Sequence, residues 1–95
     1  MRAKRTDSNH TELVEALRAC GCMVQSLASV GVGCPDLLCW SRGAWHLIEV
    51  KDGAKCPSHR ELTPAEKSWH KCAKMHGASV HTVTSAAEAL KAVGL

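Results

Sequence analysis

The stretch GCPDLLCWSRGAWHLIEVKDG, residues 33–53, decides the fold and carries the most unusual charges of this chain. Two apolar segments, DLLCWS and AWHLIEVK, meet at the sequence RGA and predict an antiparallel β-hairpin. Asp36 begins the first strand, and Glu49 and Lys51 end the second. Because the start of one hairpin strand lies beside the end of its partner, we expect both carboxylates at the same end of the sheet.

The side-chain period of a strand groups these charges further. Glu49 and Lys51 share one face, and Val50 points to the other. Two carboxylates and a backbone carbonyl suit Mg²⁺, which keeps several waters and takes one or two protein carboxylates. A lysine beside a metal-bound water can orient that water or help it lose a proton, so the combination favours phosphodiester hydrolysis. The alternative interpretation makes Glu49 and Lys51 an ion pair on a half-exposed strand and Asp36 a turn cap.

The segments around the hairpin predict a single α/β domain over residues 1–95, with a mixed sheet flanked by helices and the element order αβββαβα. Residues 1–8 are expected to form a flexible basic arm. In chain order the other segments are a helix over 9–21, a strand over 22–30, a polar loop over 52–61, a helix over 62–77, a strand over 78–84 and a helix over 85–95.

Capping motifs support all three helix starts, including Ser85 with Glu88 three residues later before the last helix. Thr63 is the expected N-cap of the helix over 62–77, with Pro64 at the first helical position and Glu66 completing a capping box. Asn9 is the candidate N-cap of the first helix, with Glu12 three residues later.

Composition indicates a small soluble globular domain, since 45% of the 95 residues are hydrophobic and 22% are charged. No apolar run approaches the roughly 20 residues of a membrane span, and no secretory leader is evident. We therefore expect a cytoplasmic protein without membrane contact.

Six cysteines raise the alternative of a zinc or redox protein. They form no CxxC pair and no cysteine–histidine pairing at zinc-finger spacing, so zinc is not expected. Cys20, Cys39 and Cys72 fall at apolar positions of the pattern and are expected to be buried as small hydrophobic side chains. Trp40 and Trp45 flank the hairpin turn and are expected to pack together.

Basic residues form three groups, although the formal net charge is only +3. Such groups can contact DNA phosphates without reading sequence, whereas a lysine stripe on a helix can equally be its solvated face. On the helix over 62–77 the stripe lies opposite Ala65, Trp69, Cys72 and His76. The groups are Lys55, His59 and Arg60 in the loop after the hairpin, Lys67, Lys71 and Lys74 on that helix, and Arg2, Lys4 and Arg5 in the arm.

The run GCPDLLCW…LIEVKDG…LTPAEKSWH resembles the small VRR-NUC domains of phage and bacterial genomes, members of the PD-(D/E)XK nuclease superfamily related to archaeal-type Holliday junction resolvases. The similarity extends from about Asn9 to the C-terminus. The resemblance implies that Asp36 and Glu49 ligate a divalent metal, that the Val50 carbonyl adds a ligand, and that Lys51 serves the nucleophilic water.

The same resemblance assigns an acid of the first helix to the metal site. Glu12 is the candidate, directly or through a water, with Glu15 as a substitute. Glu12 is equally well explained as the capping partner of Asn9. Relatives often carry glutamine where this chain has Glu66; either residue closes a capping box, so the helix is expected to form and no catalytic role is expected at that position. No catalytic role is assigned to His70 from the sequence.

The function expected from these residues is a Mg²⁺- or Mn²⁺-dependent DNA endonuclease. The resemblance to resolvases favours branched DNA, with duplex DNA also considered, in phage or bacterial DNA metabolism. We expect a homodimer, because two-fold symmetric cleavage needs two sites. The alternative is a non-catalytic nucleic-acid-binding module of the same fold.

Overall fold

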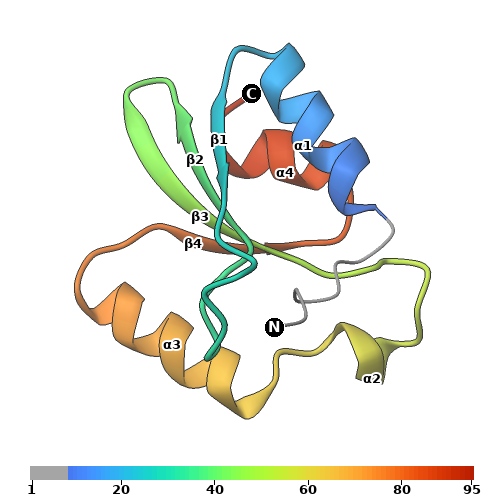
Figure 1. Cartoon of the computed structure of the whole chain (residues 1–95), viewed down its shortest axis with the longest axis vertical. Coiled ribbons are helices and arrows are strands. Elements are labelled where there is room, and N and C mark those ends of the chain that lie inside the picture. Colours follow the sequence, from blue (N-terminus) through green and yellow to red (C-terminus); the bar gives the residue numbers. More distant parts are fainter. Residues whose placement is uncertain (1–8) are drawn as a thin grey trace.

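A computed structural model describes residues 9–95 of the chain (Figure 1). The basic arm expected over residues 1–8, including Arg5, lies outside the described residues. The elements are α1 (His10–Ala19), β1 (Met23–Ser26), β2 (Leu37–Ser41), β3 (Ala44–Val50), α2 (Pro57–Arg60), α3 (Pro64–Met75), β4 (Val80–Val83) and α4 (Ala86–Ala92).

The four strands form one mixed sheet in the order β1-β2-β3-β4. The first three strands are antiparallel neighbours, and β4 pairs parallel to β3. Helices α1 and α4 lie together on one side of the sheet and α3 lies on the other (Figure 1). The expected α/β domain, with a mixed sheet flanked by helices, is thereby confirmed. No helix among residues 9–95 is long and apolar enough to cross a membrane.

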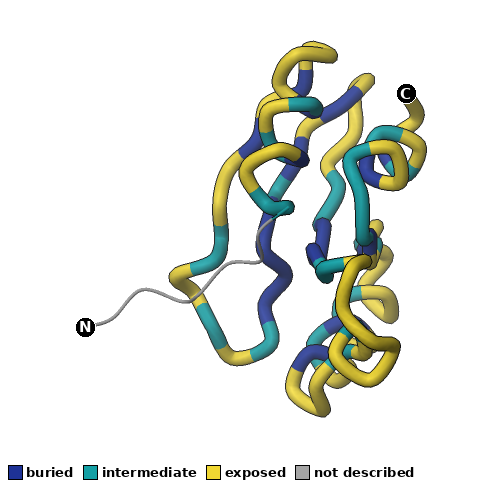
Figure 2. The backbone as a smooth tube through the Cα atoms, turned by 90° about the vertical axis from the view of Figure 1, so that its right-hand side faces the viewer, coloured by how far each residue is buried: buried dark blue, intermediate teal, exposed yellow. Residues whose placement is uncertain are grey.

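The hydrophobic core lies between the sheet and the α1–α4 pair. Figure 2 shows the buried segments running along the central strands, with the outer turns exposed. Alternate residues of the strands supply the sheet side of this core, as the period of two requires. The core residues are Leu13, Leu17, Cys22, Val24, Leu37, Cys39, Ile48, Val50, Val83, Ala89 and Val93. Glu49 lies between Ile48 and Val50 and therefore points to the opposite face, toward α3.

Two segments differ from their predicted extent. The segment predicted as a loop over 52–61 contains the short helix α2, which begins at Pro57, a residue suited to the first helical position. The strand predicted over 22–30 ends at Ser26. Beyond Ser26 the amide of Leu27 donates to the carbonyl of Asp36, and the amide of Val30 donates back to Leu27 in a turn.

The capping prediction is confirmed for α3 and wrong for α1. The Thr63 hydroxyl accepts the Glu66 amide, and the Glu66 carboxylate accepts the Thr63 amide. Asn9 occupies the N-cap position, but its side chain makes no capping bond. Its amide group donates instead to the carbonyls of Lys51, at 3.2 Å, and Thr84, at 2.9 Å. Asn9 therefore fastens the start of α1 to the end of β3.

The cysteine prediction holds only in part. Cys39 is fully buried, and burial together with contact with Cys22 raises the pKa of its thiol to about 12, which keeps it protonated. Cys22 and Cys34 are also buried, whereas Cys20 and Cys72 are exposed. Cys20 is the C-cap of α1 and lies beyond the buried face of that helix. The buried residues of α3 are Glu66 and His70, so Cys72 is not on its buried face.

The tryptophan prediction is confirmed. Trp40 and Trp45 are directly opposed across the hairpin, with ring centroids 4.9 Å apart. Both rings remain partly exposed.

Gly33 brings the loop before β2 against the start of α3. Its φ of +83° is a backbone conformation that favours glycine, and an added Cβ would meet the backbone of Ala65 and Glu66. This close approach holds the loop that leads into Asp36 beside the helix that carries Glu66. Gly31 also has a positive φ, +72°, but an added Cβ there would meet open space.

Replacing Gly33 with alanine is therefore expected to destabilise the protein far more than replacing Gly31. Gly31→Ala should cost about 1–2 kcal/mol, the strain of the left-handed backbone alone. Gly33→Ala adds a clash with helix backbone, which cannot move aside as a side chain can. Urea unfolding of both variants measures the difference, and equal losses would contradict the close approach.

Candidate active site

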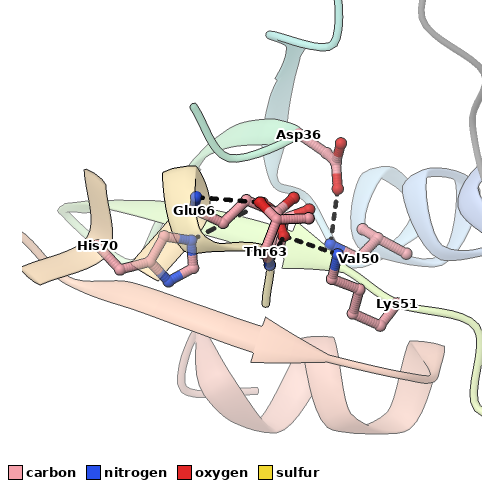
Figure 3. Close-up of polar contacts among 7 residues, drawn as sticks. Asp36, Val50, Lys51, Thr63, Glu66 and His70 are labelled. Atoms are coloured by element: carbon pink, nitrogen blue, oxygen red, sulfur yellow. Dashed lines mark hydrogen bonds and ion pairs between the residues drawn. The ribbon is translucent and has the colours of Figure 1, made fainter. Parts of the chain in front are cut away.

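Asp36 stands at the point where the loop enters β2, and it is buried, with 6% of its surface exposed. Its Oδ2 accepts a hydrogen bond from the Val50 amide at 2.8 Å. The register pairs Leu37 with Ile48, which sets Asp36 beside the end of β3. The prediction that the hairpin brings both carboxylates to one end of the sheet is therefore confirmed. Figure 3 shows Asp36, Lys51, Glu66 and His70 gathered around this end of β3.

Glu49 is the most deeply buried acid of the site, with 1% of its surface exposed. Burial, a side-chain hydrogen bond with Asp36 and the nearby charges of Asp36 and Glu66 raise its pKa to about 9, against a smaller opposing effect of Lys51. Its Oε1 is buried without a hydrogen-bond partner. The interpretation of Glu49 and Lys51 as a simple ion pair on a half-exposed strand is therefore wrong, because this carboxyl is enclosed.

Lys51 reaches across to α3 and pairs with Glu66. The Lys51 Nζ lies 2.9 Å from Glu66 Oε1, the oxygen that also accepts the Thr63 amide at 2.8 Å. The Lys51 amide donates to the Val83 carbonyl at 2.9 Å, which continues the β3–β4 pairing beyond the end of β3. The cation is thus held between a strand and a capped helix.

His70 completes this group of polar side chains from α3. It is 4% exposed, and its Nε2 lies 3.7 Å from Glu49 Oε1. This separation is too long for a hydrogen bond, and Nε2 is buried without a partner. Burial, with the charge of Lys74, lowers the pKa of His70, which favours a neutral imidazole.

The sequence interpretation missed the place of Glu66 and His70. It gave Glu66 a capping role only, and it placed Ala65, Trp69, Cys72 and His76 on the face of α3 away from the lysines. The structure buries Glu66 and His70 instead. Their spacing of four residues, which puts two polar groups on one helical face, is the signal that could have indicated them.

Within the described part of the chain, the acids proposed from the first helix make no direct contact with the buried pair, and a contact of Glu12 with the metal through a water stays a prediction. Glu12 and Glu15 are exposed on α1, and no hydrogen bond or ion pair joins either to Asp36 or Glu49 among residues 9–95. The Asn9 side chain makes no capping bond, so the capping box that would have explained Glu12 does not form.

Basic side chains flank the site on two sides. Lys55 is exposed just before α2, His59 is exposed within α2, and Arg60 is half-buried. Lys67, Lys71 and Lys74 line an open hollow of about 540 Å³ together with His70, so the lysine stripe of α3 borders the same residue that faces Glu49.

The acidic pair fits a divalent cation. Within residues 9–95 no group of three or more histidine, cysteine, aspartate or glutamate side chains is arranged to hold a metal ion. Mg²⁺, however, is commonly held by one or two carboxylates with waters. Burial and the neighbouring Asp36 raise the pKa of Glu49, so two charged carboxylates here are unfavourable. A cation held by these hard oxygen donors would offset that cost.

Comparison with known proteins agrees with this geometry. No protein-family model matches the chain, and no curated protein does. A solved structure described as a VRR_NUC domain matches with 27% sequence identity, a TM-score of 0.64, and coverage of 90% of this chain and 94% of that chain. The resemblance to VRR-NUC domains inferred from the sequence is thereby confirmed, in sequence and in fold.

Proposed function

We propose that this protein is a metal-dependent DNA endonuclease that hydrolyses phosphodiester bonds. The observation that carries the proposal is the burial of Asp36 and Glu49 side by side, at the start of β2 and the end of β3, next to Lys51. Burying two carboxylates together is unfavourable unless a cation or a proton compensates them. A non-catalytic binding module would gain nothing from that arrangement.

Asp36, Glu49 and the Val50 carbonyl would hold Mg²⁺ or Mn²⁺. When bound, the ion supplies Lewis acidity and a water of lowered pKa. Lys51 is the cation of the site, and its proposed role is to orient the attacking water and to stabilise charge on the phosphate. Glu66 holds the Lys51 ammonium in place through their 2.9 Å contact. Its own position is set by the capping box with Thr63.

DNA is proposed to bind across the basic side chains that flank the acidic pair. Lys67 and Lys71 border the hollow that His70 lines, and Lys55, His59 and Arg60 follow the strand that carries Glu49. Such contacts hold phosphates on either side of the scissile bond and carry no sequence preference. Arg5, proposed for the same role, lies outside the described residues.

The double variant Lys67→Ala, Lys71→Ala is expected to weaken binding to duplex DNA and to reduce its salt dependence. Each lost phosphate contact lowers the slope of log affinity against log salt by about one. The slope of the double variant should therefore be lower by about two. Fluorescence anisotropy over a salt series measures the slope. Lys91→Ala, a lysine of α4, is the matched control and should keep the parent slope.

Branched DNA and a homodimer complete the proposal. Both rest on the family's resemblance to junction resolvases and on symmetry, because cutting two strands of a symmetric junction needs two active sites. A phage or bacterial role in DNA metabolism, in the cytoplasm, is proposed on the same basis.

The direct test is incubation of purified protein with labelled four-way junction, flap, duplex and single-stranded DNA, in Mg²⁺, Mn²⁺ or EDTA. The proposal expects cleavage in either metal and none in EDTA, with the junction cut fastest. DNA binding without cleavage of any substrate would contradict the nuclease and favour the non-catalytic module.

A further inference from the structure

Two buried atoms without hydrogen-bond partners face each other at the end of β3. Glu49 Oε1 and His70 Nε2 are both inaccessible to solvent and unpartnered, and they lie 3.7 Å apart. Leaving a buried polar atom unpaired is unfavourable. The gap is only about 0.7 Å longer than a typical N–H···O hydrogen bond. A small adjustment of either side chain would pair both atoms at once.

The helix that carries His70 is fixed relative to Glu49. Glu66 lies one turn before His70, and it is held by the capping box at the start of α3 and by Lys51 at the end of β3. His70 therefore reaches Glu49 from a helix that is already fastened to the same strand. The imidazole also lines the hollow bordered by Lys67 and Lys71, so it separates Glu49 from that surface.

A ligating carboxylate usually has a second partner. When one oxygen binds a cation, the other can accept a hydrogen bond that sets the carboxylate's orientation, and loss of such a partner typically weakens metal binding. Asp36 Oδ2 already has such a donor in the Val50 amide. Glu49 Oε1 lacks one, and His70 Nε2 is the polar atom aimed at it.

We propose that His70 is a positioning residue, whose Nε2–H donates a hydrogen bond to Glu49 Oε1 when Glu49 holds the divalent cation. The inference rests on the proposed function and adds to it a residue that touches neither the metal nor the DNA. It assigns the Nε2–H tautomer to a neutral imidazole.

Three substitutions of His70 test the role through metal affinity, measured by calorimetric titration with Mn²⁺ without DNA. His70→Gln keeps a nitrogen donor near the Nε2 position. His70→Asn also has a nitrogen donor, but its shorter side chain ends one bond before that position. His70→Leu fills the space without a donor. We expect His70→Asn and His70→Leu to lose about 10- to 100-fold in Mn²⁺ affinity, and His70→Gln to stay close to the parent.

The outcomes separate this inference from the proposed function. Parent protein that binds Mn²⁺, with binding abolished in Asp36→Asn, establishes the metal site independently of His70. Parent affinity in His70→Asn, or equal losses in the Gln and Asn variants, would then overturn the positioning role alone. Parent protein that binds no Mn²⁺ would overturn both. If His70→Leu fails to fold, as judged by circular dichroism, the matched Gln and Asn pair still decides.

Discussion

Lys51→Ala is expected to reduce the rate of DNA cleavage by about 10²- to 10³-fold, the usual effect of removing one preorganised charge-stabilising group. The Lys51 side chain is 13% exposed, and its ammonium lies 2.9 Å from Glu66 Oε1. Single-turnover cleavage of a labelled junction at saturating Mg²⁺ measures the effect on the chemical step. DNA affinity should change little, because one enclosed cation contributes little to phosphate binding.

Glu66→Gln is the informative companion variant. The amide oxygen can still accept the Thr63 amide and the Lys51 ammonium, so the capping box and the placement of Lys51 should persist. Glu66→Gln should therefore retain far more activity than Lys51→Ala. Lys91→Ala on α4 serves as the control for loss of a lysine elsewhere. Cleavage by Lys51→Ala at the parent rate would contradict the role given to Lys51.

Glu49→Gln is expected to have two opposite effects. It should abolish metal binding and cleavage, because an amide cannot replace a ligating carboxylate. It should also stabilise the metal-free protein above neutral pH. The folded state raises the pKa of Glu49 from 4.5 to about 9 through burial and Asp36, so the folded state binds this proton more tightly than the unfolded state.

The pH dependence of the free energy of unfolding follows from this raised pKa. The stabilisation from protonated Glu49 is complete below about pH 4.5 and is lost progressively as the pH rises to about 9. In EDTA the parent should therefore lose stability on the order of a few kcal/mol over this range. Glu49→Gln carries no such proton and should lose much less. Urea unfolding at a series of pH values measures both proteins, with the exposed Glu61→Gln as the matched control.

A divalent cation should restore the stability that the parent loses as the pH rises. Mn²⁺ binds the folded state, so at about pH 8 it should raise the parent's free energy of unfolding and leave Glu49→Gln unchanged. If the free energies of unfolding of the parent and of Glu49→Gln changed in parallel with pH, the buried, protonated carboxyl in the metal-free protein would be contradicted.

The hairpin and its acidic end could be predicted from sequence because their determinants are local. Apolar alternation and the Arg-Gly turn define two antiparallel strands, and pairing alone then brings Asp36 beside the end of β3. The start of α3 was predictable for the same reason, since Thr63 and Glu66 identify each other at a fixed spacing.

The α3 side of the site could not be predicted from local patterns. Apolarity suggested that Trp69 and Cys72 face inward, but the surface beneath α3 carries the buried Glu49, and the helix turns Glu66 and His70 toward it. The hydrogen bonds of the Asn9 side chain could not be predicted for the same reason, because its partners Lys51 and Thr84 are distant in sequence. The four-residue spacing of Glu66 and His70 indicates a shared helical face, but only tertiary structure decides that this face is buried against Glu49.

The central claim is that the buried pair of Asp36 and Glu49 holds a metal ion that cleaves DNA. The most direct measurement is single-turnover cleavage of a labelled four-way junction by the parent and by Asp36→Asn, each with Mg²⁺ and with EDTA. We predict cleavage by the parent in Mg²⁺ only, and a loss of at least about 10²-fold in Asp36→Asn. Equal cleavage by both proteins, or cleavage that persists in EDTA, would contradict the account.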